Sequence, residues 1–209
     1  MGSESGNVTI MALLFMGSLA TALVLALETS CAYAQKTVYD NLLNIAREET
    51  FSAGFDMKLK SSDDPGLLIC EKARDSLRAN SYQGQIEMEF YEATPEEIED
   101  ANPAIDSADN VRVIVYRIRI GQPYRNVAAP ALWLSDVTLT SEATASMCPY
   151  ALHKTYRPEG IDGTTWRYAI SAESEEVRVE NTGARPEQSL AAELEEALKK
   201  PSELHDANQ

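Results

Sequence analysis

The sequence is poor in positive charge. Its 209 residues contain 18 Lys and Arg against 33 Asp and Glu, so the formal net charge is -15. An acidic surface repels phosphate backbones, and no dense run of Lys and Arg offsets this locally, so nucleic-acid binding is disfavoured. The 10 glycines and 9 prolines are too few for low-complexity sequence, and no internal period indicates stacked repeats. These absences favour a folded chain with one main domain.

Residues that commonly carry catalysis are also scarce. The only histidines are His153 and His205, and neither lies in a recognisable motif. The sequence has no nucleophile elbow, zinc-protease motif, phosphate-binding loop or dinucleotide-binding fingerprint. We therefore expect a protein that is not an enzyme, with no catalytic residue, cofactor or metal ligand. A membrane-tethered hydrolase that uses His153 beside a nucleophile and a carboxylate is a weaker alternative.

One long stretch near the start has no charge at all. The residues from Val8 to Leu27 are twenty successive positions without a charged side chain. As a helix rising 1.5 Å per residue they would extend about 30 Å, which matches the hydrocarbon thickness of a bilayer. The sequence therefore predicts a single membrane span from Val8 to Leu27.

A cleaved signal peptide is the alternative to a retained anchor. Ala32-Tyr33-Ala34 before Gln35 has the small-x-small form of a cleavage site. Two features favour the anchor. The residues ahead of the run carry Glu4 and no Lys or Arg, whereas signal peptides begin with a positively charged region, and the run is longer than the usual signal core.

Beyond Leu27 the helical pattern continues, because no Gly or Pro occurs before Gly54. Apolar residues recur there at intervals of three and four, which places them on one helix face. They are Cys31, Ala34, Val38, Leu42 and Ile45. We therefore expect one long helix that leaves the membrane as an amphipathic stalk and docks this stripe on a globular domain.

Short motifs follow one another in this N-terminal region. They are Ser5-Gly6-Asn7-Val8-Thr9-Ile10-Met11-Ala12-Leu13-Leu14-Phe15, then Glu28, Tyr33 and Leu42-Leu43-Asn44-Ile45-Ala46. In this order they resemble the N-terminal segment of TadE/TadG-like proteins of Tad (Flp) pilus assembly, over about residues 5 to 55. The resemblance implies a single-pass protein of the bacterial inner membrane with a periplasmic C-terminal domain. It also implies an adhesive-pilus system whose other membrane proteins are the partners, and homo-oligomers are compatible with it.

The chain departs from the family pattern at two places. Pilin-like members have a Glu five residues after the Gly that prepilin peptidase cuts, whereas Met11 stands there, which disfavours processing at Gly6. Some members carry a metal-binding Asp-x-Ser-x-Ser loop, and the nearest match is Asp136-x-Thr138-x-Thr140. Too little chain follows it for that domain, so we interpret these residues as one face of a strand.

The orientation of the span is a third departure. Lys36, Arg47, Lys58 and Lys60 all follow the span, and the positive-inside rule taken alone would keep that side in the cytoplasm. Only Lys36 lies close to the span, and long domains are exported regardless of charge. We keep the exported orientation.

The pattern predicts three regions. They are an anchor and stalk at 1–54, an exported α+β domain at 55–184 and a terminal helix with a disordered tail at 185–209. Asp64-Pro65 begins a short helix that extends to about Ala79. Leu190, Leu194 and Leu198 have helical spacing near the end. The predicted fold is α+β, with the long N-terminal helix and the short helix packed on a mostly antiparallel sheet.

The strands are predicted from alternation with a period of two. The first strand contains Ile86, Met88 and Phe90; the others cover 110–121, 132–140 and 164–172, with an edge strand near Val177 and Val179. A turn at Gly160-Ile161-Asp162-Gly163 precedes the fourth strand. If the first two strands are antiparallel neighbours, Arg117 and Arg119 lie opposite Glu87 and Glu89. Each such pair adds a few tenths of a kcal/mol, so it specifies register more than stability.

The segment 92–109 contains seven acidic residues and no basic one. Its carboxylates could bind Ca²⁺ in an exterior compartment, but no EF-hand spacing is present, so a solvated acidic loop is favoured.

The chain has three cysteines. In an oxidising compartment Cys70 and Cys148 could form a disulfide that closes a loop of about 79 residues and contributes on the order of 4 kcal/mol. Two buried free thiols are the alternative. Cys31 lies at the membrane edge, where a lone thiol usually acts as a small apolar residue.

Two functions stay open. The first is a non-enzymatic, single-pass component of Tad pilus assembly. The second is a secreted or periplasmic binding module released by cleavage after Ala34.

Overall fold

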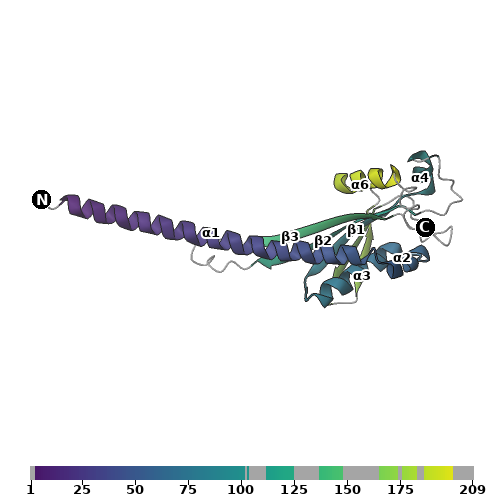
Figure 1. Cartoon of the computed structure of the whole chain (residues 1–209), viewed down its shortest axis with the longest axis horizontal. Coiled ribbons are helices and arrows are strands. Elements are labelled where there is room, and N and C mark those ends of the chain that lie inside the picture. The colour runs from purple at the N-terminus through teal and green to yellow at the C-terminus, as the bar shows by residue number, and fades with distance from the viewer. Residues whose placement is uncertain are drawn as a thin grey trace. The chain divides into compact units, whose positions relative to one another are not determined.

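The fold was obtained as a computed structural model that describes residues 3–101, 103, 112–124, 137–147, 165–173, 176–182 and 186–199 (Figure 1). The chain divides into two compact units. One comprises Met1–Val38 and Gln122–Leu139, and the other comprises Tyr39–Gly121 and Thr140–Gln209. The fold is α+β, with a long N-terminal helix, short helices and a five-stranded sheet, as the sequence predicts.

Helix α1 extends without a break from Ser3 to Glu49, over 47 residues. Its hydroxyl side chains return their hydrogen bonds to the preceding turn: Thr21 donates to the Gly17 carbonyl at 2.9 Å, and Thr29 donates to the Leu25 carbonyl at 2.8 Å. These bonds leave few polar groups that need water. The predicted single long helix is confirmed, and it ends a few residues before Gly54, where a second helix, α2 (Ala53–Lys60), begins after Ser52.

The sheet has the strand order β3-β2-β1-β4-β5. Its strands are β1 (Gln85–Glu92), β2 (Ile114–Tyr124), β3 (Val137–Met147), β4 (Trp166–Ser171) and β5 (Val177–Asn181). β1 pairs antiparallel with β2 and with β4, and β4 pairs antiparallel with β5. The predicted antiparallel arrangement is therefore present, with β1 at the centre.

The third strand extends further along the chain than the sequence predicts. Of the predicted range 132–140, only 137–140 belongs to β3, which continues to Met147; residues 132–136 lie outside the described residues. The buried positions of the later half are Ser141, Ala143, Ala145 and Met147. Three of these are small residues, so the alternation has weak hydrophobic contrast and was missed.

One sheet face forms the main core of the second unit. Its side chains include Ile86, Met88 and Phe90 of β1, which are buried with Ile118 and Ile120 of β2. Helix α3 (Pro65–Ala79) contacts this face at β1 and β4. Asp64 caps α3 by accepting a hydrogen bond from the Leu67 amide at 2.8 Å, and Pro65 opens the first turn, as predicted.

The opposite sheet face is apolar at one end only. There Tyr91, Val113 and Val115 pack with two helices, α4 (Pro95–Ala101) and α6 (Gln188–Lys199), in a second cluster of buried residues. The predicted terminal helix is confirmed, and Leu190, Leu194 and Leu198 are among its buried residues. The predicted disordered tail after it lies outside the described residues.

The segment 92–109 is not a simple acidic loop where the structure describes it. Glu92 ends β1, and residues 95–101 form α4. Thr94 and Glu97 exchange side-chain hydrogen bonds with each other's amides, a capping box that starts this helix. The prediction of a solvated loop was wrong for residues 95–101. The many acidic residues drew attention away from the Thr94 and Glu97 capping pattern. Among the described residues no group of three or more His, Cys, Asp or Glu could hold a metal ion; Asp106 and Asp109 lie outside them.

Gly66→Ala is expected to lower the free energy of unfolding by about 1–2 kcal/mol, because overpacking outweighs the gain in helix propensity. A Cβ on Gly66 would lie 2.3 Å from Tyr168 Oη. That hydroxyl cannot move away cheaply, because it is buried and donates to Asp64 Oδ1 at 3.0 Å. Urea unfolding followed by circular dichroism measures the loss. Gly54→Ala is the control, since nothing lies within 4 Å of its Cβ position. Equal stability of the two variants would contradict the prediction.

Candidate functional site

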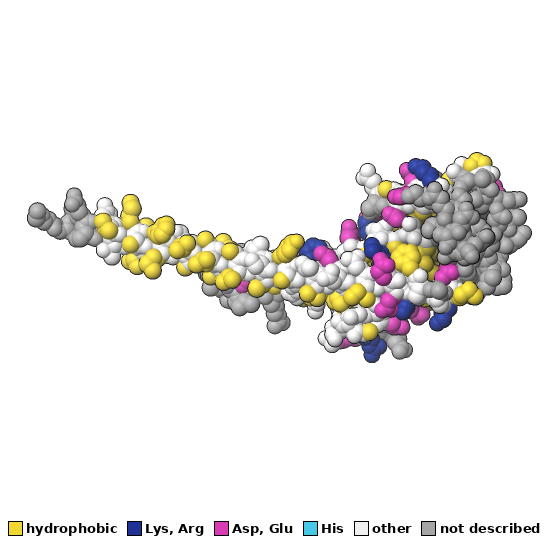
Figure 2. All heavy atoms as spheres, viewed as in Figure 1, with side chains coloured by type: hydrophobic (Ala, Val, Ile, Leu, Met, Phe, Trp, Pro, Cys, Tyr) yellow, Lys and Arg dark blue, Asp and Glu magenta, His cyan; other side chains and the backbone are white. Residues whose placement is uncertain are grey.

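Helix α1 is the first candidate functional element. From Asn7 onward it is long and apolar enough to cross a membrane. No other helix in the described part of the chain meets both conditions. Figure 2 shows its hydrophobic side chains on the surface, and Leu14, Phe15 and Met16 are each about two-thirds exposed. Water-exposed side chains of this kind are unfavourable, whereas lipid accommodates them. The predicted span Val8–Leu27 lies within this helix, although a signal sequence has the same composition.

The apolar stretch of α1 ends at a carboxylate. Glu28 is 8% exposed, and its Oε2 accepts a hydrogen bond from the hydroxyl of Tyr124 at 2.9 Å. Tyr124 is the last residue of β2 and belongs to the same compact unit as Glu28. This bond gives a buried carboxyl group a hydrogen-bond partner at the end of the predicted span. The sequence marks Glu28 as the closing acidic residue, but its partner is 96 positions away and has no local signal.

The later part of α1 docks through a different face from the predicted one. In the second unit, the buried residues of α1 are Tyr39, Leu43 and Ala46, and Thr50 just after its end is buried too. Val38 and Ile45 of the predicted stripe are 54% and 44% exposed, and Cys31 is also exposed. The prediction of that stripe was wrong by one residue, about 100° of helix rotation. Both faces have helical spacing, so the sequence alone could not separate them.

Specific contacts determine the rotation of α1 in this unit. The hydroxyls of Thr50 and Tyr116 share a buried hydrogen bond. Tyr39 packs edge-on against Tyr82, with ring centroids 6.2 Å apart. Lys72 of α3 donates to Glu49 Oε2 at 2.7 Å, and this bond lowers the pKa of Glu49. These polar contacts at the end of α1 distinguish the buried face from the neighbouring one, which is also apolar.

Several residues that the sequence analysis singled out have no functional contact in the described part of the structure. Cys70 is buried, and burial raises the pKa of its thiol to about 12. Cys148 lies outside the described residues, so the Cys70–Cys148 disulfide stays a prediction. His153, His205, Asp136 and the turn 160–163 also lie outside them, whereas Thr138 and Thr140 belong to β3. Gly6 and Ala34 both lie within α1.

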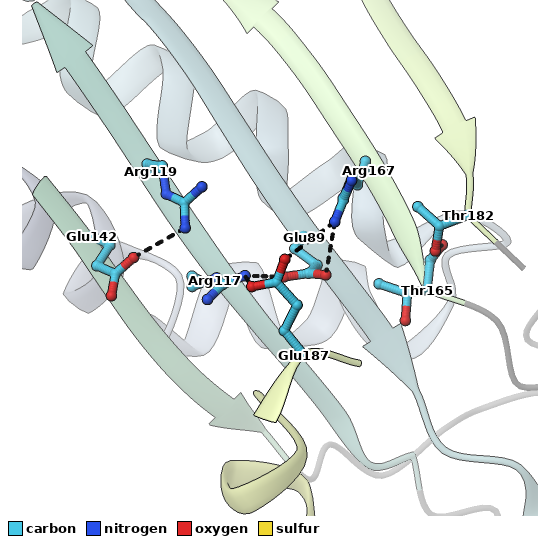
Figure 3. A network of polar contacts seen from close by, with 8 residues as sticks. All are labelled: Glu89, Arg117, Arg119, Glu142, Thr165, Arg167, Thr182 and Glu187. Atoms are coloured by element: carbon cyan, nitrogen blue, oxygen red, sulfur yellow. Dashed lines mark hydrogen bonds and ion pairs between the residues drawn. The ribbon is translucent and has the colours of Figure 1, made fainter. Parts of the chain in front are cut away.

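A charged cluster on the second sheet face is the other candidate site (Figure 3). The register places Arg117 opposite Glu89, Glu89 opposite Arg167, and Arg167 opposite Glu180, so charge alternates across four strands. The next row is Arg119, Glu87, Ala169 and Arg178. The predicted pairing of Arg117 and Arg119 with Glu89 and Glu87 is confirmed.

The centre of the cluster is buried. The side chains of Arg117 and Glu89 are each 8% exposed and form a direct ion pair. Because a buried charge without its partner is costly, this pair matters for stability as well as register. The predicted few tenths of a kcal/mol is a value for solvent-exposed pairs. It fits the exposed pair of Arg119 and Glu142, whose charged atoms are 3.3 Å apart.

A fifth residue joins the cluster from outside the sheet. Glu187, just before α6, accepts from Arg117 Nη2 at 2.5 Å and from Arg167 Nη2 at 3.3 Å (Figure 3). The hydrogen bond from Arg117 lowers the pKa of the Glu187 carboxyl. These ion pairs are therefore complete above the ordinary carboxyl pKa and are lost as pH falls through the lowered one. Sequence reasoning missed Glu187, because it lies 70 positions from Arg117.

The cluster borders a cavity of about 740 Å³. Four arginines and four glutamates line it, together with apolar residues of β1, β4 and β5. They are Arg117, Arg119, Arg167, Arg178, Glu87, Glu89, Glu180 and Glu187. Two of these charged residues, Arg178 and Glu180, lie on β5. In the sequence they alternate with Val177 and Val179, and this alternation was the pattern that could have placed them on one sheet face.

In comparisons with known proteins, no family model, curated protein or solved structure matches this chain.

Proposed function

We propose that the protein is a non-enzymatic, single-pass membrane component of Tad (Flp) pilus assembly. Helix α1 is its anchor in the bacterial inner membrane, and the α+β domain is periplasmic. The observation that carries the anchor is the composition of α1. One unbroken helix contains an exposed apolar stretch of bilayer length and, later, a face buried in the α+β core. The anchor and the docking element are therefore the same helix.

The assignment to pilus assembly has separate support. It comes from the resemblance of residues 5–55 to TadE/TadG-like proteins, and the acidic closing residue of that pattern is Glu28. In this proposal the exposed side chains of α1 contact lipid and the helices of other assembly proteins. Ser18 and Thr21 keep their hydroxyls bonded within α1, so they leave no polar group unsatisfied at such a contact.

One observation favours the alternative of a released binding module. The residues of α1 that are buried in the second unit begin at Tyr39, after the Ala34 cleavage point. A mature chain that started at Gln35 would keep Tyr39, Leu43, Ala46 and Thr50, and with them the whole docked face. Cleavage after Ala34 would therefore leave the docked face of α1 in the domain.

Membrane fractionation combined with intact mass tests the anchor. We expect the chain to stay in the inner-membrane fraction after alkaline carbonate washing, with a mass that includes Val8 to Leu27, because a hydrophobic helix of this length inserts stably. External protease should digest the domain in spheroplasts and spare it in intact cells. A soluble chain that begins at Gln35 would reject the anchor.

Deletion of the gene in a piliated host tests the pilus role. We expect loss of surface pili, restored by the full chain and not by a chain that starts at Gln35. Normal piliation in the deletion strain would reject this part of the proposal while leaving the anchor intact.

A further inference from the structure

The cavity on the sheet face is locally balanced in a strongly acidic protein. Four guanidinium groups and four carboxylates line it, so their formal charges cancel, while the whole chain carries -15. The cavity is therefore less negative than the protein as a whole. Exposed charges farther apart than about 8–10 Å are largely screened at physiological ionic strength, so the local groups decide what binds.

Two of these arginines have unused hydrogen-bonding capacity. Arg178 of β5 is exposed, faces Ala169 across the ladder, and has no ion pair among the described residues. Arg119 is 43% exposed, and its ion pair with Glu142 is at 3.3 Å. A guanidinium carries five N–H donors, which suit carboxylates in particular. The small side chain of Ala169 leaves room between the two arginines.

Glu187 shows which chemistry the cavity accepts. Glu187 lies outside the sheet, and its carboxylate forms ion pairs with Arg117 and Arg167. Its side chain is nevertheless 52% exposed. Glu89 also contacts both arginines and is buried on the central strand. If Glu187 left, Glu89 would keep the buried Arg117 paired. Replacement of Glu187 by another carboxylate therefore avoids the cost of an unpaired buried charge.

Spacing indicates the size of the ligand. Arg119 on β2 and Arg178 on β5 lie in one row of the sheet, three strand intervals apart. At about 4.8 Å per interval the two backbones are roughly 14 Å apart, so a small dicarboxylate is too short to bridge the two side chains when both stand upright on the sheet. An extended peptide rises about 3.4 Å per residue, so carboxylates four positions apart match the spacing. The volume of about 740 Å³ is in the range of ligand sites.

We propose that this cavity binds an extended acidic peptide segment of a partner protein. Carboxylates four positions apart in the segment bind Arg119 and Arg178, and a third carboxylate or the backbone displaces Glu187 from Arg117 and Arg167. Glu187 thus acts as an internal competitor for the acidic segment. The inference does not depend on the membrane anchor or on the pilus role.

Fluorescence anisotropy with labelled peptides tests the site on the full chain in nonionic detergent at low salt. The probe is fluorescein-labelled Glu-Thr-Thr-Thr-Glu, and the matched peptide has glutamine at both ends. We expect the glutamate peptide to bind at least tenfold more tightly. The double variant Arg119→Gln, Arg178→Gln should weaken this binding at least tenfold, because both anchoring guanidiniums are lost. Glu187→Gln should strengthen it severalfold by removing the competitor.

The control variant is Arg78→Gln, on an exposed position of α3 that does not line the cavity. It should leave the affinity unchanged, and circular dichroism should show that all variants are folded. Equal binding of the two peptides, an equal loss in Arg78→Gln, or no gain in Glu187→Gln would overturn the proposal. Competition by free succinate as effective as that by unlabelled peptide would also overturn it, since it would indicate a small-anion site.

Discussion

Arg112→Met is expected to lower the free energy of unfolding by about 3–5 kcal/mol, because it leaves a buried carboxylate without its partner. Arg112 is 1% exposed, and its Nε donates to Glu92 Oε1 at 2.7 Å. Its Nη1 donates to the carbonyls of Leu59 and Ser62 at 2.6 and 2.9 Å. One side chain thus joins the end of β1, the start of β2 and the end of α2. The fall in the urea midpoint of the full chain in detergent, followed by circular dichroism, measures the loss.

Two comparisons separate the buried pair from a general effect of losing charge. The double variant Arg112→Met, Glu92→Leu should recover part of the stability, because it removes the unpaired carboxylate as well. Arg78→Met, at an exposed position of α3, should change stability by less than about 1 kcal/mol. A loss below 1 kcal/mol for Arg112→Met would contradict the buried pair that the structure shows.

The double variant Phe15→Arg, Leu19→Arg is expected to remove the chain from the membrane fraction. Both residues lie in the middle of the apolar stretch, and their side chains are 67% and 51% exposed. An arginine near the centre of a span costs about 2.5–3.5 kcal/mol on insertion scales. Two of them cost roughly 5–7 kcal/mol, which is more than a thousandfold in the insertion equilibrium. Immunoblots of carbonate-washed membranes measure the effect.

Ile45→Arg is the matched control in the same helix. Ile45 is 44% exposed and lies beyond the apolar stretch, so an arginine there meets water and should leave membrane retention unchanged. Retention of the double variant at the wild-type level would show that Phe15 and Leu19 do not lie within a bilayer. The proposed anchor would then be rejected, whether or not the chain is cleaved after Ala34.

Local patterns predicted much of the fold. The alternation of Ile86, Met88 and Phe90 predicted β1, and the pairing of Glu87 and Glu89 with Arg119 and Arg117 followed from a single assumption of antiparallel neighbours. The α3 cap was also visible, because its signal lies within four residues. Segments of weak contrast were missed or shifted, namely α2, α4 and the later half of β3.

The candidate sites were less visible than the fold. The span could be read from composition, but the docked face of α1 could not, since Val38 and Ile45 have the same helical spacing as the buried Tyr39 and Ala46. Only contacts from elsewhere in the chain, such as that of Thr50 with Tyr116, separate the two faces. The charged cavity also depends on Glu187, which no local pattern connects to Arg117.

By itself, the amino-acid sequence determined the class of this protein: an acidic chain with an uncharged N-terminal segment of bilayer length and an α+β fold. These properties follow from composition and from periods of two and 3.6 residues, which act over short stretches of chain. The tertiary structure alone decided which side of α1 is buried, that Arg112 and Arg117 are buried with carboxylate partners, and that Glu187 lies across two arginines. Those outcomes depend on groups far apart in the chain, whose burial and pairing energies exist only after the elements have packed.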